Sequence, residues 1–159
     1  MRRKSLQDAI CPMARALDTI GDWWSLLIIR DAMLGVRRFS DFQANLGLAG
    51  NILSARLKKL VACDIMEQVP AANGSAYQEY ALTKRGRTLL PVVVALRQWG
   101  EDHLFASEEK CLRIIDKRSR KPLRRIQVQD ADGKLITAKD LDVVTVKLGQ
   151  FHPVTLARP

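Results

Sequence analysis

The stretch GNILSARLKKLVAC, residues 50–63, has the spacing of a helix with two different faces. Four apolar residues recur at helical intervals and predict a face packed on a core: Leu53, Leu57, Leu60 and Val61. The opposite stripe carries an amide, a hydroxyl, a methyl and an ammonium group: Asn51, Ser54, Ala55 and Lys58. One face is therefore predicted to be buried and the other to meet a partner.

The groups of the second stripe can recognise donors, acceptors and the thymine methyl group in the major groove of DNA. Arg56 and Lys59 flank the stripe, where phosphates would lie. We interpret residues 50–63 as a DNA recognition helix. The alternative is an ordinary amphipathic surface helix, since polar helix faces with Lys and Arg are common. The neighbouring segments must decide between the two.

Three further helices are predicted before this one. Residues 12–20 have apolar side chains at helical spacing. Asp22 can cap a second helix, WWSLLIIRDAML (residues 23–34), which is apolar almost all round and must therefore be central. Ser40 is predicted to cap a third helix that runs to about Leu46. A short glycine-containing connection then leads to the candidate recognition helix, which is the helix-turn-helix pattern.

A β-hairpin is predicted directly after the recognition helix. IMEQV (residues 65–69) and YQEYAL (residues 77–82) are rich in strand-forming residues, and PAANGSA between them carries the Pro, Asn and Gly of a turn. A hairpin in this position is a wing, so the pattern predicts a winged helix-turn-helix.

A long helix is predicted for residues 83–105, capped by Thr83 and kinked at Pro91, because proline lacks a backbone donor and crowds the preceding turn. Its apolar stripe is longer than a small winged domain needs to cover. We infer a dimer contact between this helix and residues 12–20, which would hold two recognition helices about one turn of DNA apart. The predicted interface residues are Met13, Leu17, Leu89, Val92, Val93, Leu96 and Trp99. The alternative is that the helix merely completes its own core.

Composition limits the class of protein. The 159 residues suffice for one well-cored domain plus an appendage, and a formal net charge of +9 favours a polyanionic partner such as nucleic acid. Three scattered cysteines suit a reducing compartment. We find no signal-peptide pattern and no apolar run long enough for a bilayer, so we expect a cytoplasmic protein without a membrane partner. Enzyme motifs such as a phosphate loop, a nucleophile elbow or HExxH are missing, so we expect neither catalysis nor a cofactor.

Four segments together resemble one family of regulators. The run CPMARALDTIGDWWSLLIIRDAMLGVRRFSDF, then LSARLKKL, EYALTKRG and LLPVVVALRQWG are similar in order and spacing to the HxlR-type winged helix-turn-helix regulators, relatives of the MarR regulators. The resemblance covers about residues 9–103. It implies a dimeric cytoplasmic transcription factor, often responsive to reactive electrophiles or aldehydes. It places the recognition helix on residues 50–62 and a phosphate-gripping basic pair on Arg37 and Arg38.

The predicted DNA-binding set combines this pair with the helix cap and the recognition helix: Arg37, Arg38, Ser40, Asn51, Ser54, Ala55, Arg56, Lys58 and Lys59. Two features depart from the family. Ala49 and Gly50 open the recognition helix where the family usually has Ser followed by Pro or a similar residue. The wing, residues 68–79, contains no basic residue. We therefore expect the major-groove helix to supply most of the specificity.

Cys11 is the candidate sensor. In HxlR-type regulators of thiol stress the sensing cysteine lies in this N-terminal position, and Cys11-Pro12 matches that motif. Proline suits the first helical position, which leaves Cys11 at the end of the helix where the dipole favours a thiolate. The alternative is a small, inert residue that is buried under the dimer helix. Cys63 and Cys111 are weaker candidates, because Cys63 ends the recognition helix and Cys111 begins the tail.

Residues 108–159 are predicted to be a basic extension separate from the winged domain of residues 1–107. Their alternating pattern and the turn signal DADGK predict a small antiparallel β tail. No CxxC is present and Cys111, His103 and His152 are isolated, so we expect no metal site. The segment KRSRKPLRR (residues 117–125) is dense in Lys and Arg. Two interpretations remain for it: contact with phosphates, or a solvated turn.

These inferences define an α+β fold: a winged helix-turn-helix with a long C-terminal dimerisation helix and a small antiparallel β tail. The predicted function is a homodimeric, sequence-specific transcriptional regulator that binds an operator in double-stranded DNA and responds to an electrophile or thiol stress through Cys11. The alternative function is an interaction or sensor module that kept the winged fold without sequence-specific DNA binding, since fold does not fix function.

Overall fold

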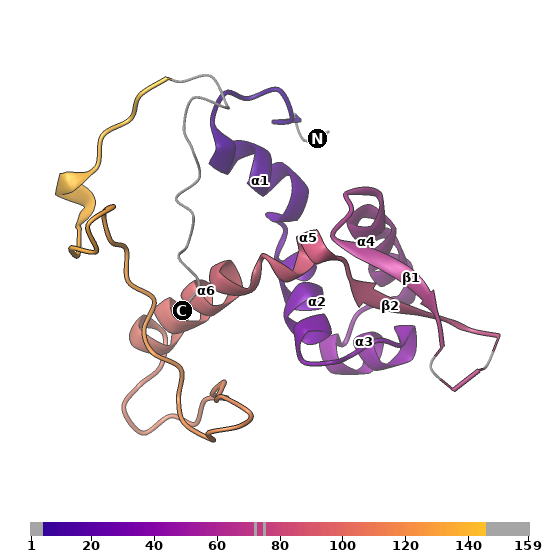
Figure 1. Cartoon of the computed structure of the whole chain (residues 1–159). Coiled ribbons are helices and arrows are strands. Elements are labelled where there is room, and N and C mark those ends of the chain that lie inside the picture. The colour runs from indigo at the N-terminus through magenta and orange to yellow at the C-terminus, as the bar shows by residue number, and fades with distance from the viewer. Residues whose placement is uncertain (1–4, 72, 75, 146–159) are drawn as a thin grey trace. The chain divides into compact units, whose positions relative to one another are not determined.

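A computed structural model describes residues 5–71, 73–74 and 76–145. The chain divides into two compact units, Met1–Gly100 and Glu101–Pro159, and each is described by itself. The first unit contains helices α1 to α4, a two-stranded hairpin, and then α5 and most of α6 (Figure 1).

Helices α1 (Pro12–Ile20) and α2 (Trp23–Met33) have the predicted bounds to within a residue or so. Cys11 is the N-cap of α1 and is extended, with proline at the first helical position. Asp22 caps α2 as expected, because its Oδ1 accepts a hydrogen bond of 3.0 Å from the backbone N–H of Ser25.

Helix α3 (Phe39–Leu46) begins one residue before the predicted cap. The prediction that Ser40 is the N-cap is wrong, because Arg38 takes that position without a side-chain cap. The cause is tertiary: the backbone oxygen of Arg37 accepts a hydrogen bond of 2.8 Å from the N–H of Tyr80 in the hairpin. This bond keeps the chain extended up to Arg38, and the helix starts immediately afterwards.

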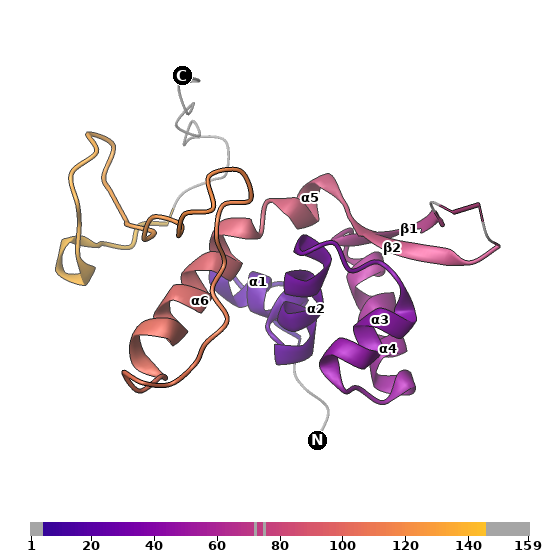
Figure 2. The same ribbon diagram turned by 90° about the horizontal axis from the view of Figure 1, so that it is seen from below.

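Helix α4 (Gly50–Ala62) follows a turn in which Gly47 adopts a left-handed conformation, φ 62°. Strands β1 (Met66–Pro70) and β2 (Gln78–Leu82) pair antiparallel, with Met66 opposite Leu82 and Pro70 opposite Gln78. The hairpin extends beyond the helical body, while α3 and α4 lie next to each other (Figure 2). The predicted wing is confirmed.

The core lies where α2, α3, α4 and the hairpin meet. Each of these elements contributes side chains to it. Its buried members are Ile20, Ile28, Ile29, Phe42, Leu48, Leu53, Leu57, Leu60, Ile65, Met66 and Leu82. Because α2 buries residues against both helix-turn-helix helices, it is the central helix that its all-round apolar character predicts.

The predicted single kinked helix is instead two helices, α5 (Lys84–Arg87) and α6 (Leu90–His103). Pro91 lies in the first turn of α6, where its missing N–H would have no helical partner anyway. Thr83 caps α5 as expected, since its Oγ1 accepts from the N–H of Gly86 at 2.9 Å. The same Oγ1 donates to the backbone oxygen of Asp64 at 2.7 Å, which ties α5 to the turn that follows α4.

The second unit has little regular structure in its described residues, 101–145. The predicted DADGK turn is confirmed: Asp130 Oδ1 accepts from the N–H groups of Asp132 and Lys134, and Gly133 has φ 81°. The described residues of this unit form no continuous strands, because their strand pairing is limited to isolated bridges. They also contain a short 3₁₀-helix, η1 (Ala138–Asp140). No described side chain of this unit is buried, so nothing holds alternating strands together. Residues 146–159, with His152, lie outside the described residues.

Candidate nucleic-acid interface

Helix α4 separates two faces. Leu53, Leu57 and Leu60 are fully buried, whereas Asn51 and Lys58 are exposed. Ala55, which is exposed, and Ser54, which is half-buried, complete this outward face. The helix is therefore held rigidly by one side while the other presents polar groups and a methyl group to solvent.

The first turn of α4 lacks a side-chain cap. Ala49, at the N-cap position, has no side chain that can accept a hydrogen bond. Instead, Asn51 Oδ1 accepts from the N–H of Ile52 at 2.9 Å. The same N–H also donates to the backbone oxygen of Ala49 at 3.0 Å. The shared bond fixes the Asn51 amide at the exposed end of the helix.

Arg56 and Lys59 turn toward the protein rather than standing free beside the stripe. Arg56 Nε lies 3.1 Å from Asp22 Oδ1, and Lys59 Nζ donates to the backbone oxygen of Asp18 at 2.8 Å. These contacts join α4 to the α1–α2 connection. Local sequence patterns do not predict these contacts, because Asp22 was expected to act only as a helix cap.

Arg37 and Arg38 share one buried carboxylate. Arg37 Nε lies 2.8 Å and Arg38 Nε 3.5 Å from the two oxygens of Glu79 on β2, and Glu79 is only 5% exposed. Both arginine side chains remain about half exposed. Glu79 thus orients the basic pair at the start of α3. This role of Glu79 is not predicted from the sequence, since a Glu in a hairpin is ordinarily solvated.

The remaining predicted DNA residue, Ser40, is exposed in the first turn of α3 and donates to Asp41 Oδ1 at 3.3 Å. A hollow of about 510 Å³ separates this turn from the wing. It is lined by Arg38, Phe39, Ser40, Ala71, Asn73, Tyr77, Gln78 and Glu79. A basic residue, a hydroxyl and an aromatic ring therefore border the gap between helix and wing.

The predicted dimer residues fall into two groups. Leu89 and Val93 are half-buried against the unit's own core. The other five are exposed: Met13, Leu17, Val92, Leu96 and Trp99. Helix α1 buries only Ile20 among its residues, and α6 only Val94. Both helices therefore leave apolar side chains uncovered in the single chain.

The three cysteines are free. Cys11 is exposed in the single chain, whereas the alternative of a cysteine packed under the dimer helix concerns the dimer. Cys63 is half-buried against the core, and Cys111 is half-buried in the second unit.

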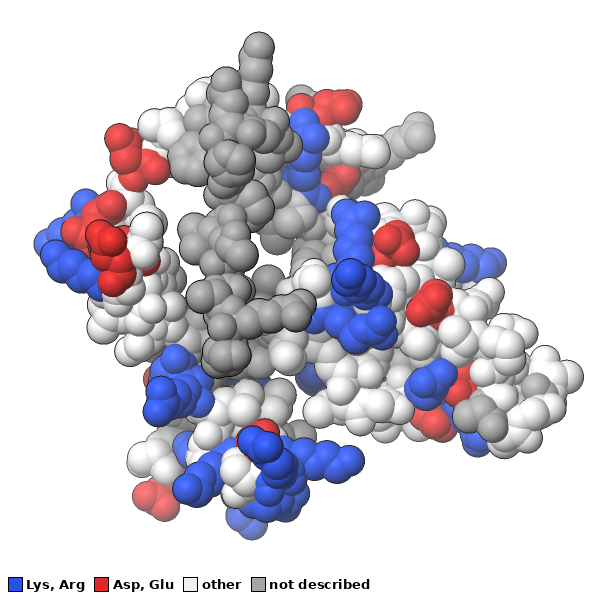
Figure 3. All heavy atoms as spheres, viewed as in Figure 1, with Lys and Arg blue, Asp and Glu red and all other residues white. Residues whose placement is uncertain are grey.

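Lys and Arg side chains gather over α5 (Figure 3), where Lys84, Arg85 and Arg87 occupy three of its four positions. This basic cluster was not singled out from the sequence. Across the described residues, no group of three or more His, Cys, Asp or Glu side chains is arranged to hold a metal ion. None of the described helices is long and apolar enough to cross a bilayer.

Residues 19–108 match the sequence model of HxlR-like helix-turn-helix proteins. The chain belongs to this family. An HTH-type transcriptional regulator of Mycobacterium tuberculosis is 42% identical over 92 residues, which are 58% of each chain. A second, from Synechocystis, is 32% identical over 64% of this chain and 75% of its own. The match therefore spans 58% of the length of the mycobacterial relative.

Solved structures resemble the chain in the same way. PA1607, a candidate transcription factor, is 51% identical and covers 89% of this chain and 99% of its own, with a TM-score of 0.84. The redox regulator HypR in its oxidised form is 30% identical over 60% of this chain and 100% of its own, with a TM-score of 0.55. The chain thus shares the winged-helix fold of these proteins and belongs to a family of HTH-type, non-enzymatic DNA-binding proteins.

Proposed function

We propose that this HxlR-like protein is a homodimeric regulator that recognises one operator sequence through α4. The observation that carries the proposal is the division of α4, in which three leucines are fully buried while Asn51, Ala55 and Lys58 face solvent. An amide can pair with adenine, a methyl group can contact the thymine methyl, and an ammonium can contact guanine in the major groove. Because residues 68–79 of the wing contain no basic residue, α4 is left as the main source of specificity.

Arg37 and Arg38 are proposed to contact phosphates. The Glu79 carboxylate pairs with the Nε of each guanidinium, and both arginine side chains remain half exposed at the start of α3. The helix N-terminus adds backbone donors for an anion. Such contacts position the protein on the duplex without reading sequence. Since Arg56 and Lys59 are engaged with Asp22 and Asp18, we assign them a smaller share of the phosphate contacts.

The test is a footprint on the DNA upstream of the protein's own gene, followed by binding measurements at several salt concentrations. Lys58→Ala and Asn51→Ala should each weaken operator binding by about 1 to 3 kcal/mol and random DNA much less. Arg37→Ala should weaken all duplexes alike and reduce the salt slope by about one unit. Lys139→Ala, an exposed lysine of the second unit, is the matched charge control.

Equal affinity for every duplex, with no footprint, would support the alternative of an interaction module that kept the fold. That alternative predicts that Lys58→Ala behaves like Lys139→Ala on all DNA.

Dimerisation is proposed to cover the exposed apolar residues of α1 and α6. Leu96 and Trp99 are each more than half exposed, an unfavourable arrangement for a soluble single chain. Leu96→Glu should dissociate the dimer, because it would place an unpaired charge in the contact, whereas Leu112→Glu, at an exposed site of the second unit, should not. Sedimentation at micromolar concentration distinguishes the two. A monomeric wild type would contradict the proposal.

Cys11 is proposed to be the signal input. It is exposed at the N-cap of α1, beside the proposed dimer contact, and HypR, a redox regulator, is similar over 60% of this chain. A quinone would be attacked by the Cys11 sulfur at a ring carbon, and the thiol proton would end on a ring oxygen. The thioether formed would then alter the helix packing and so the operator affinity.

The measurement is operator binding during titration with a quinone, for wild type, Cys11→Ser and the half-buried control Cys63→Ser. Loss of the response only in Cys11→Ser supports the switch. Unchanged wild-type binding after complete modification of Cys11 would remove it.

A further inference from the structure

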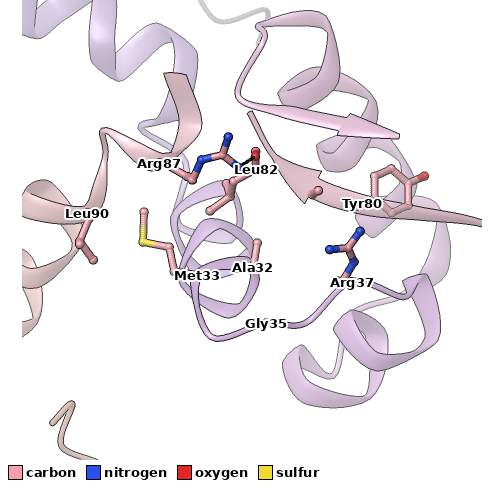
Figure 4. Close-up of a pocket in the computed structure, with 9 residues that line it drawn as sticks. Ala32, Met33, Gly35, Arg37, Tyr80, Leu82, Arg87 and Leu90 are labelled. Atoms are coloured by element: carbon pink, nitrogen blue, oxygen red, sulfur yellow. Dashed lines mark hydrogen bonds between the residues drawn. The ribbon is translucent and has the colours of Figure 1, made fainter. Parts of the chain in front are cut away.

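A cavity of about 360 Å³ opens where the end of α2, strand β2 and the start of α6 come together (Figure 4). Its apolar lining includes Met33, Leu82 and Leu90, and the side chains of Met33 and Leu90 face the space between α2 and α6. The volume falls within the range of small-molecule sites, about 300 to 1,000 Å³. The cavity therefore has room for a compact hydrocarbon body.

Two arginines lie at the edge of this cavity, Arg87 from α5 and Arg37 from the α2–α3 connection. Arg87 Nη1 donates to the backbone oxygen of Leu82 at 2.5 Å, which holds the guanidinium beside the apolar lining. The carboxylate of Glu79 accepts a hydrogen bond from the Nε of Arg37. Both Arg37 and Arg87 are exposed residues, so each guanidinium is accessible to a ligand in the cavity.

No other charged group among the described residues lines the cavity. Tyr80 contributes its ring, while its hydroxyl is engaged by the Gln68 side chain at 3.2 Å. An apolar wall with two guanidinium groups and no carboxylate in the lining suits one chemical class: an organic anion with a flat or compact apolar body. Arginine binds a carboxylate in bidentate fashion, and such charge-assisted bonds are the strong ones.

We propose that this cavity is an effector site, in addition to the proposed signal input at Cys11, and that it binds a small aromatic or alicyclic carboxylate. The carboxylate is held by Arg87, with Arg37 as its second partner, and the ring packs on Met33, Leu82 and Leu90. This site is separate from Cys11, which is not among the residues that line it.

The site is coupled to DNA through Arg37, a step that rests on the proposed function. A guanidinium that holds the carboxylate is less able to hold a DNA phosphate. Occupancy therefore weakens DNA binding, and by linkage DNA weakens binding of the carboxylate by the same factor. The walls of the cavity come from the wing strand and from the helices on both sides of it, so the ligand also fixes the wing against α2.

The experiment compares naphthalene-2-carboxylate with its neutral counterpart naphthalene-2-carboxamide, by calorimetry on the full-length protein without DNA. The carboxylate should bind at least about tenfold more tightly than the amide. Arg87→Gln should remove that preference, while Arg85→Gln, one helix face away and outside this cavity, should keep it.

A second pair of variants covers the case in which Arg87→Gln disturbs folding. Leu90 is half exposed, so Leu90→Glu should fold and should repel the carboxylate, lowering its affinity about tenfold. Thr88→Glu adds the same charge outside the cavity and should have no such effect. Equal binding of carboxylate and amide, or an unchanged preference in both Arg87→Gln and Leu90→Glu, would overturn the proposal.

Addition of DNA distinguishes the proposed carboxylate site from the proposed DNA-binding function. With the carboxylate at ten times its Kd, full competition would weaken operator binding about elevenfold. If the carboxylate preference holds while no duplex binds, the site stands and the proposed function falls. If an operator is bound but the carboxylate has no effect on it, the coupling through Arg37 is wrong.

Discussion

The first unit of the chain (residues 1–100, the winged unit) and the second (residues 101–159, the tail) are both rich in strand-forming residues. Among the described residues, however, only the winged unit builds a sheet. In the winged unit the hairpin places Met66 and Leu82 in a core shared with residues of helices α1 to α4. In the tail, none of the described residues 101–145 is buried, and its turns rest on local bonds such as those of Asp130 and Asp140. Alternation predicts a strand, but a sheet forms only where one face has something to pack on.

The largest expected difference between the units concerns an apolar truncation. Leu57→Ala removes a fully buried side chain of α4 and should lower the free energy of unfolding by about 2 to 5 kcal/mol. Leu123→Ala, at an exposed position of the tail, should change it by less than about 0.5 kcal/mol. Urea denaturation followed by tryptophan fluorescence measures both. Similar losses would mean that the tail is as tightly packed as the wing.

A methyl group added to a glycine should distinguish the units next. A Cβ on Gly86 would lie 2.1 Å from the backbone oxygen of Ile65, so Gly86→Ala must move α5 or the strand. Helix propensity alone would favour alanine by about 1 kcal/mol, whereas overpacking costs about 1 to 3 kcal/mol or more. We expect a net loss and a lower Tm.

The matched change in the tail is Gly133→Ala, where φ is 81° and no atom lies within 4 Å of the added Cβ. It should strain the local turn by about 1 kcal/mol and leave the Tm of the winged unit unchanged. A raised Tm for Gly86→Ala would show that α5 relaxes without cost.

Removal of one buried charge should have a smaller effect. Glu79→Gln replaces the carboxylate that Arg37 and Arg38 share, and should lower the free energy of unfolding by about 1 to 2 kcal/mol, since both arginines are half exposed. Glu67→Gln, on the exposed side of β1, is the control and should be close to neutral. Equal effects of the two substitutions would mean that Glu79 does not hold the wing.

The smallest effect is expected in the tail. The backbone N–H of Thr137, and then its hydroxyl, donate to Asp140 and lower the pKa of that carboxyl below its ordinary 3.8. A lowered folded-state pKa stabilises the turn above the unfolded pKa, and this contribution is lost as the pH falls through the folded pKa. Titration by NMR should give a low pKa for Asp140, partly restored in Thr137→Ala. An unchanged value in that variant would mean that the hydroxyl contributes nothing.

Local sequence predicted most of the elements of the winged unit. The bounds of α1 and α4, the Asp22 and Thr83 caps and the hairpin follow from periodicity, capping chemistry and turn residues that lie within a few positions of one another. The start of α3 did not follow, because the bond from Tyr80 to Arg37 joins residues far apart in the chain. The break before α6 was signalled by Pro91, but proline fits both a kink and a helix start.

The sequence by itself determined which residues belong to the recognition helix and which of its faces is apolar, because side-chain spacing and hydrophobicity are local properties. Only the tertiary structure decided which basic residues remain available. It paired Arg56 with Asp22, oriented Arg37 and Arg38 on Glu79, and brought Arg87 beside an apolar cavity. The physical reason is that a charge is positioned by the partner it meets across the fold, and that meeting depends on how the helices and the wing pack.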